Sequence, residues 1–301
     1  MIKSLFSFRH LRTQLIVYFM IISLAGMAGA SYYIYSFMQN MIKEQNERLL
    51  YQQFQQLDHN IGALISEVDR LSMLFLRDDR IQQLLYGISE KTELELLEAK
   101  NDVQNNIEDI IGNYGYIDSI YITADNLGAV GGNENTTLVY AKEDWEKTFF
   151  SSEPFRRSIE EYPKMIVQGG LKKSFYNPYM TDAKDGNLIS MMRRTRAIYD
   201  PRTSATLIFN IDERYLASIY ATALGEDEGD MYIVDGSGTV ISSSRPERVG
   251  SASAFMPAEQ EPGSYGSRVG SQNSQELQIV YYKLNDAGWY MMKEIPLYQY
   301  S

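Results

Sequence analysis

The sequence predicts an α+β protein with an N-terminal transmembrane helix, a long stalk helix and two antiparallel-sheet domains in tandem. Three observations predict this order. An apolar run without charges covers residues 15–38, a heptad pattern of apolar residues follows it, and strand-like patterns separated by turn residues begin near residue 116. The acidic segment at residues 226–230 then separates two sets of strands, which predicts a domain boundary there.

The apolar run at residues 15–38 is long enough to cross a bilayer, because roughly 20 apolar residues span the hydrocarbon core as a helix. Lys3, Arg9 and Arg12 precede it, with no acidic residue among them. Positive flanks stay cytoplasmic, so residues 1–14 are expected inside the cell membrane and the body of the chain outside it. The alternative is a cleaved signal peptide, since residues 28–30 offer small side chains for cleavage. The run continues past that point, which favours an uncleaved anchor.

The composition excludes several classes of function. The chain has no cysteine, so disulfides and thiolate chemistry are excluded, and the usual ligands of structural zinc sites are absent. Its formal net charge of -11 argues against nucleic-acid binding, because phosphate contacts need clustered Lys and Arg. An acidic surface instead suits solubility outside the cell.

A stalk helix is expected over residues 39–86, ended by Gly87. Apolar residues recur at spacings of four and three, the pattern of a heptad seam. They are Leu50, Phe54, Leu57, Ile61, Leu64, Val68, Leu71 and Phe75. The seam has two readings: it pairs with the same helix of a second subunit, or it is the spine on which a sheet packs. Further apolar residues widen the stripe, so both are expected in different parts of the helix.

The first sheet domain is expected over residues 87–224. Thr92 and Glu95 fit a capping box that begins a helix ending near Gly112. Strands are expected at 117–123, 164–168, 188–199 and 204–211, with a turn at 200–203 and an irregular or weakly helical stretch at 145–162. Asp212 then caps a short helix that runs to about residue 221.

The second, smaller sheet domain is expected over residues 225–296. Strands are expected at 231–234, 239–243, 264–269, 276–284 and 289–295, with turns at 235–238 and 285–288. Residues 297–301 are interpreted as the start of a second transmembrane segment that the sequence does not include.

The order of these elements resembles the double Cache sensor module, and most of all the extracytoplasmic part of YesM-like sensor histidine kinases. Three segments carry the resemblance: residues 189–212 (ISMMRRTRAIYDPRTSATLIFNID), 232–242 (YIVDGSGTVIS) and 287–296 (AGWYMMKEIP). The resemblance implies two PAS-like (Cache) domains, the first membrane-distal and the second membrane-proximal. In that family a second membrane helix, a HAMP segment and a kinase module follow, so the chain is expected to be truncated before them.

No catalytic residues, metal site or cofactor are expected. The sequence contains no P-loop, G-x-S-x-G or H-E-x-x-H motif. Its two histidines, His10 and His59, lie in the basic tail and off the heptad seam, where surface positions are the expected reading. A hydrolase is disfavoured because no nucleophile and base set is recognisable.

The resemblance places a ligand pocket between the distal sheet and the loops that follow its early strands. These loops hold Trp145, Phe149, Phe150, Tyr176 and Tyr179. By strand alternation, Ser190, Met192, Arg194 and Arg196 share one side of the facing strand, and the other, more apolar side suits packing on the stalk. Aromatic walls with a few polar groups are typical of a small-molecule site. The alternative is that the aromatic residues are core and the arginines are solvated.

The family's amino-acid-binding pattern places an Arg shortly before a Trp-Tyr pair, and residues 143–146 lack both the Arg and the Tyr. A carbohydrate or another small polar ligand is therefore the more open expectation.

These observations predict the ligand-sensing region of a membrane-bound two-component sensor histidine kinase, which acts as a homodimer through its stalk and transmembrane helices. The alternatives are the sensor half of a chemoreceptor or another transmembrane receptor, and a membrane-anchored binding or adhesion protein without signalling output.

Overall fold

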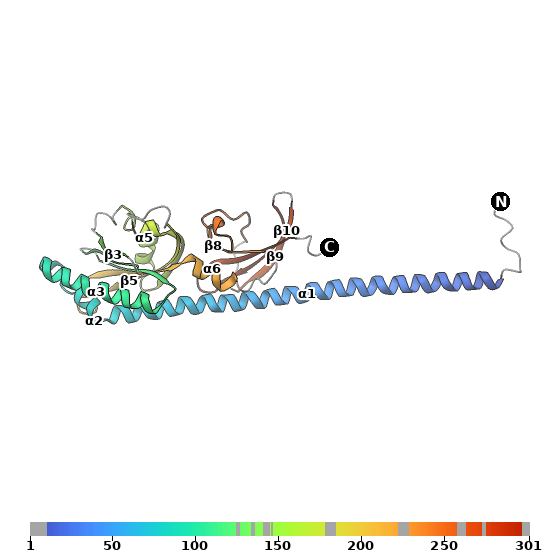
Figure 1. Ribbon diagram of the computed structural model, residues 1–301, viewed down its shortest axis with the longest axis horizontal. Coiled ribbons are helices and arrows are strands. Elements are labelled where there is room, and N and C mark those ends of the chain that lie inside the picture. The colour runs from blue at the N-terminus through green and yellow to red at the C-terminus, as the bar shows by residue number, and fades with distance from the viewer. Residues whose placement is uncertain are drawn as a thin grey trace. The chain divides into compact units, whose positions relative to one another are not determined.

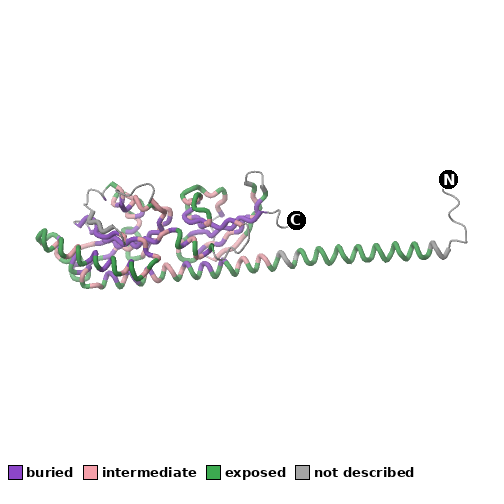
Figure 2. The backbone as a smooth tube through the Cα atoms, in the orientation of Figure 1, coloured by how far each residue is buried: buried purple, intermediate pink, exposed green. Residues whose placement is uncertain are grey.

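The computed structural model describes residues 11–124, 127–133, 136–140, 145, 147–177, 185–221, 229–257, 263–272 and 275–296. The chain forms two compact units, residues 1–53 and residues 54–301. Both contain part of one helix, α1 (Leu11–Arg77). In the first unit, residues 15–38 of α1 are exposed (Figure 2). It is long and apolar enough to cross a membrane by length and composition.

The second unit contains two antiparallel sheets, which makes the predicted α+β architecture correct (Figure 1). The first sheet has the strand order β3-β2-β1-β6-β5-β4 and the second has the order β8-β7-β11-β10-β9. The strands of the first sheet are β1 (Ile117–Ala124), β2 (Gly128–Asn133), β3 (Thr136–Tyr140), β4 (Met165–Lys172), β5 (Asn187–Arg196) and β6 (Ser204–Asp212). The strands of the second sheet are β7 (Asp230–Val234), β8 (Val240–Ser243), β9 (Tyr265–Gln272), β10 (Gln275–Lys283) and β11 (Tyr290–Pro296).

The second half of α1 is the spine on which both sheets pack. Phe54 stacks on Tyr282 of β10, with ring centroids 6.0 Å apart. Phe75 meets Phe209 of β6 edge-on at 5.8 Å. Within residues 54–75 the heptad seam therefore contacts sheets of its own chain, as the second reading of the pattern predicted. We call this side of each sheet its helix face and the opposite side its loop face.

The expected continuous stalk helix to residue 86 is wrong, because α1 ends at Arg77 and a separate helix α2 (Asp79–Leu85) follows. Asp78 lies between them with extended backbone, and its carboxylate accepts a hydrogen bond from the Arg80 backbone N–H at 2.9 Å. An aspartate in this position caps the start of a new helix, which ends the old one. Gly87 has a φ of 57°, a left-handed conformation that suits its predicted terminating role.

The capping box that begins α3 (Glu93–Asn113) is confirmed: the Thr92 side chain accepts from the Glu95 backbone, and the Glu95 side chain accepts from the Thr92 backbone. A helix of eight residues, α5 (Glu153–Glu160), occupies the stretch expected to be irregular or weakly helical. Strands β2 and β3 were not predicted. The sequence of β2, GAVGGN, contains three glycines and only one strand-favouring residue, Val130. It pairs closely with β1, and a Cβ on Gly131 would lie 2.0 Å from the Ile120 carbonyl oxygen.

Helix α6 (Glu213–Ala221) connects the two sheets in sequence and in space (Figure 1). Asp212 caps it as predicted, accepting from the Arg214 backbone N–H at 3.0 Å. The buried Glu213 carboxylate accepts from the Ser242 hydroxyl at 2.5 Å and the Ser243 backbone at 3.0 Å, both in β8. Tyr220 shares a hydrogen bond of 2.7 Å with Ser242. A displacement of α6 would therefore act directly on β8.

Candidate functional site

The loop face of the first sheet carries most of the residues predicted for the ligand site. Met192 lies opposite Ile208 and Ser190 opposite Asn210 in the β5–β6 register. Arg194 and Arg196 continue the same alternation, so the four predicted β5 residues share one face. On the helix face, Arg193 pairs with Asp69 of α1 and donates to the Ser72 hydroxyl at 3.2 Å. The predicted alternation along β5, with one side packed on the stalk, matches these contacts.

The predicted aromatic residues pack on one another above this face. Trp145, Phe149 and Tyr176 are fully buried, whereas Phe150 is partly buried at the margin of the same cluster. The Trp145 and Phe149 rings lie 4.9 Å apart, and Tyr176 stacks on Tyr121 of β1 at 5.5 Å. The aromatic set is thus the hydrophobic core of the first sheet domain. Tyr179 lies outside the described residues.

A row of buried polar side chains crosses the sheet beneath these rings. Ser190, Asn210 and Ser119 are register partners on β5, β6 and β1. The Asn210 amide donates to the Ser119 hydroxyl at 3.0 Å. The Asn210 Oδ1, the Ser190 hydroxyl and the Tyr176 hydroxyl are buried without a hydrogen-bond partner among the described residues. Buried polar groups are nearly always paired, so three unpaired atoms in one place indicate a missing partner.

Burial of the Tyr176 hydroxyl raises its pKa well above the ordinary value, and the neighbouring Ser190 hydroxyl acts in the opposite direction. Tyr176 is therefore a neutral group that both donates and accepts hydrogen bonds. Ser190 lies close enough to influence it, although the two hydroxyls do not form a full hydrogen bond. The polar groups that face the aromatic cluster, those of Ser119, Ser190, Asn210 and Tyr176, are therefore all uncharged.

The charged groups near this row are already paired. Lys173 forms ion pairs with Asp118 and with Asp212, the latter at 3.4 Å. Burial acts to raise the pKa of Asp212, but hydrogen bonds from Arg214 and the charge of Lys173 outweigh burial and lower it. The Lys173 cation is therefore balanced by two carboxylates.

The two predicted arginines lie toward the rim of the loop face. Arg194 donates to the Thr206 hydroxyl at 3.1 Å, and its guanidinium lies 5.7 Å from the centre of the Phe155 ring. Arg196, at the end of β5, is exposed. Neither belongs to the buried row of Ser119, Ser190 and Asn210.

Sequence reasoning missed Asn210 and Ser119. A signal for Asn210 was present, because it is the single polar residue in the stretch LIFNI. Strand alternation also places it with Ile208 on the loop face. Among the residues that the structure describes, no group of three His, Asp or Glu side chains is arranged to hold a metal ion.

Comparison with known proteins places these features in a family. The family model described as Cache domain matches residues 34–300. No curated protein matches the chain.

Solved structures with a similar fold include the periplasmic sensory domain of the Campylobacter jejuni chemoreceptor Tlp1. It has 9% identity and a TM-score of 0.61, covering 86% of this chain and 98% of that one. The sensory domain of Tlp3 from the same organism, with isoleucine bound, has 10% identity, a TM-score of 0.59 and coverage of 88% and 98%. The ligand-binding domain of the Pseudomonas aeruginosa amino acid chemoreceptor PctC, in complex with GABA, has 11% identity, a TM-score of 0.57 and coverage of 83% and 99%. At these identities the likeness concerns the fold.

Proposed function

Because the chain belongs to the Cache domain family, we propose that it is the extracytoplasmic ligand-sensing region of a membrane-bound sensor histidine kinase. In this proposal residues 15–38 cross the membrane and residues 1–14 are cytoplasmic, as the basic flank indicates. The first sheet is the membrane-distal domain and the second the membrane-proximal one. Ligand binding at the distal domain is passed to the proximal domain through α6, whose Glu213 and Tyr220 bond to β8.

The ligand site is the loop face of the first sheet, and one observation carries this assignment. Tyr176, Ser190 and Asn210 present buried hydroxyl and amide atoms without a partner among the described residues. A bound molecule that supplies the missing hydrogen bonds would remove their desolvation cost of about 1–3 kcal/mol each. Trp145, Phe150 and Met192 complete the apolar surroundings, and Arg194 and Arg196 are assigned to the rim.

The chemistry of the site favours a small neutral ligand with several hydroxyl or amide groups, of which a carbohydrate is one class. The nearby Lys173 is balanced by Asp118 and Asp212. A charged ligand would therefore have to break an existing ion pair, whereas a neutral one would not.

The test is a thermal-shift screen of neutral metabolites and their charged analogues on the full chain in detergent, followed by calorimetry on variants. Asn210→Leu removes the unpaired Oδ1 and also the hydrogen bond that the Asn210 amide donates to the buried Ser119 hydroxyl, so it should cost about 1–3 kcal/mol of stability, and its affinity is measured on protein that circular dichroism shows to be folded. It should weaken ligand binding about tenfold, and Ser190→Ala should act in the same direction. Asn60→Leu, on the exposed side of α1, is the matched control.

Unchanged affinity in both Asn210→Leu and Ser190→Ala would remove these residues from the site. A screen in which only charged compounds bind would contradict the neutral-ligand assignment. A chemoreceptor is the second candidate, favoured by the fold likeness to the Tlp1, Tlp3 and PctC sensory domains. The coding sequence beyond residue 301 separates the two: a HAMP segment with a kinase module supports the first, and a methyl-accepting domain supports the second.

We also propose that the receptor acts as a homodimer through α1 and the transmembrane helix. Ala25 and Gly29 form a small-xxx-small pair in the apolar run, which allows two helices to approach closely. Cross-linking of single-cysteine variants at positions 25 and 29, in a chain that otherwise has no cysteine, would test this contact. Absence of cross-linking at both positions would argue against a dimer through this face of the helix.

A further inference from the structure

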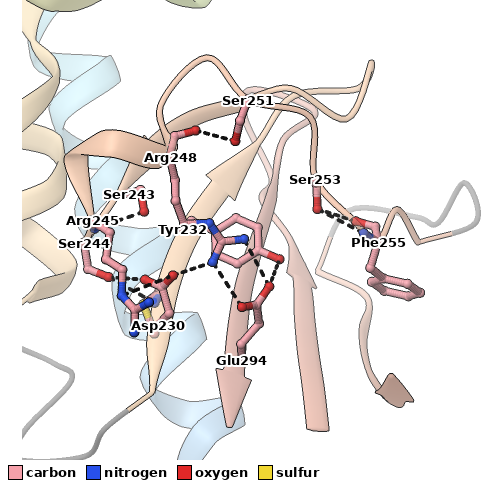
Figure 3. Close-up of polar contacts among 11 residues, drawn as sticks. Asp230, Tyr232, Ser243, Ser244, Arg245, Arg248, Ser251, Ser253, Phe255 and Glu294 are labelled. Atoms are coloured by element: carbon pink, nitrogen blue, oxygen red, sulfur yellow. Dashed lines mark hydrogen bonds and ion pairs between the residues drawn. The ribbon is translucent and has the colours of Figure 1, made fainter. Parts of the chain in front are cut away.

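The second sheet has its own loop face, and a buried ion cluster holds a loop over it (Figure 3). The two sheets share a strand order once the extra edge strand β3 is set aside, so β7 corresponds to β1 and β11 to β6. Tyr232 of β7 pairs with Met292, as Tyr121 pairs with Ile208 in the first sheet. The loop face of the second sheet is therefore the topological equivalent of the site proposed in the first.

Two carboxylates lie directly opposite each other at one end of this face. Asp230 and Glu294 are register partners on β7 and β11, and both are buried. Like charges in this arrangement repel unless a cation lies between them. Arg248, from the covering loop, supplies that cation: it forms an ion pair with Asp230 and two hydrogen bonds to Glu294 at 3.0 and 3.1 Å. Its guanidinium also lies 4.0 Å from the centre of the Tyr232 ring.

A cavity of about 220 Å³ adjoins this cluster on the same face. Gly270, Leu277 and Ile279 line it from β9 and β10, and Phe255 lines it from the covering loop. Glu294 reaches it from the side of the ion cluster, and Arg268 lies at its edge beside Phe255, 5.2 Å from the ring centre. The walls of this cavity are therefore mostly apolar, with two charged side chains.

The two charged side chains of the cavity differ in what they can offer a ligand. Glu294 is already bonded to Arg248 and to the Tyr232 hydroxyl, the latter at 2.7 Å. Arg268 is exposed and forms no ion pair within the described part of the chain. Of the two charged side chains at the cavity, Arg268 is therefore the one without an ion-pair partner among the described residues, and its charge is positive. A guanidinium in this position recognises a carboxylate through two parallel hydrogen bonds.

We propose that the proximal domain contains a second ligand site, this cavity, which takes a small carboxylate with a short apolar body. Arg268 pairs with the carboxylate, and the body lies on Leu277 and Ile279, beside Gly270. The volume is below that of pockets for drug-sized molecules, which start at about 300 Å³, so the ligand is smaller than those.

The ion cluster links this cavity to strand β11. Phe255 and Arg248 belong to the same loop, and Glu294 belongs both to the cavity and to the ion cluster. A ligand that moves Phe255 therefore acts on the contact between Arg248 and β11. Strand β11 ends at Pro296, at the C-terminal end of the second sheet.

The experiment titrates the full chain in detergent with butanoate, butanol and butylammonium, followed by ligand-observed NMR. These three probes share an apolar body and differ in charge. Butanoate should bind at least tenfold more tightly than the other two. Acetate to hexanoate, tested in the same way, should show affinity that rises with chain length and then falls when the cavity is full.

Variants separate this site from the distal one. Arg268→Gln and Gly270→Val should each weaken butanoate binding about tenfold or more. The first removes the charge, and the second adds a side chain whose Cβ would lie 3.0 Å from Ile279 Cδ1, so that both side chains crowd the cavity. Arg156→Gln, at another exposed arginine, and Asn210→Leu, in the distal site, should leave butanoate binding unchanged.

If Gly270→Val does not fold, the surface substitution Arg268→Gln still decides the matter. Failure of every carboxylate to bind, equal binding of butanoate and butanol, or full affinity in Arg268→Gln would each overturn the proposal. Loss of butanoate binding only in Asn210→Leu would assign the carboxylate to the distal site instead.

Discussion

Substitution of Arg248 by methionine tests how much the buried ion cluster of the second sheet contributes to stability. The change removes the cation that separates Asp230 from Glu294 and leaves two buried carboxylates facing each other across β7 and β11. Breaking a buried pair by removing one partner costs about 3–5 kcal/mol, because the remaining charge is uncompensated. For a folded unit of about this size, that corresponds to a fall in melting temperature of roughly 6–20 °C.

Arg245 provides a matched control, because it also contacts Asp230. Its guanidinium lies 3.7 Å from that carboxylate, and its side chain is 59% exposed, against 18% for Arg248. Exposed ion pairs contribute about 1 kcal/mol at most, so Arg245→Met should change the melting temperature little. Thermal unfolding of the full chain in detergent, followed by circular dichroism, measures both variants.

A second substitution tests the cause of the loss. In the Arg248→Met background, Glu294→Gln removes one of the two repelling charges, so the double variant should be more stable than Arg248→Met alone. The two changes concern residues in direct contact, and non-additive effects are expected there. If Arg248→Met unfolds within 2 °C of the parent, or if Glu294→Gln gives no recovery, the reasoning about the carboxylate pair is refuted.

Three further predictions concern the rest of the second unit. Ile61→Asp places a charge in the buried seam and should lower the free energy of unfolding by several kcal/mol. Leu74→Asp, at a side chain that is 52% exposed, should change the free energy of unfolding by no more than about 0.5 kcal/mol. Equal melting temperatures of the two variants would contradict the packing of α1 on the sheets. Gly131→Ala should abolish the close pairing of β2 with β1, since its Cβ would lie 2.0 Å from a backbone oxygen. In Gly112→Ala the added Cβ meets no atom within 4 Å, so this variant should be tolerated. Circular dichroism and melting curves compare the two variants. Burial raises the pKa of Glu213 above 4.5, so the folded state holds its proton more tightly and loses stability as pH rises from 4.5 through that raised pKa. Glu213→Gln should remove this part of the pH dependence, and identical melting curves against pH for both proteins would show that the group does not titrate as argued.

Local patterns in the sequence were sufficient for the elements that depend on near neighbours. The apolar run at residues 15–38, the capping box of Thr92 and Glu95 and the cap at Asp212 involve residues a few positions apart. The alternation along β5 likewise separated a loop face from a helix face before any partner strand was known. These features follow from helix and strand periodicity, which a single segment carries by itself.

The tertiary structure decided everything that depends on which distant residues meet. Heptad spacing could not say whether the seam of α1 would cover a sheet or a second helix, because both surfaces are apolar; Phe75 against Phe209 decides it for the second unit. The glycine-rich β2 exists only because β1 lies beside it, so propensity gave no sign of it.

The buried polar row and the ion cluster are non-local in the same way. Ser119, Ser190 and Asn210 come together through strand register, and Arg248 meets Glu294 across 46 positions of sequence. Side chains of this kind are individually ordinary. Their chemistry arises when pairing of the strands removes them from water and leaves each with only the partners that the fold supplies.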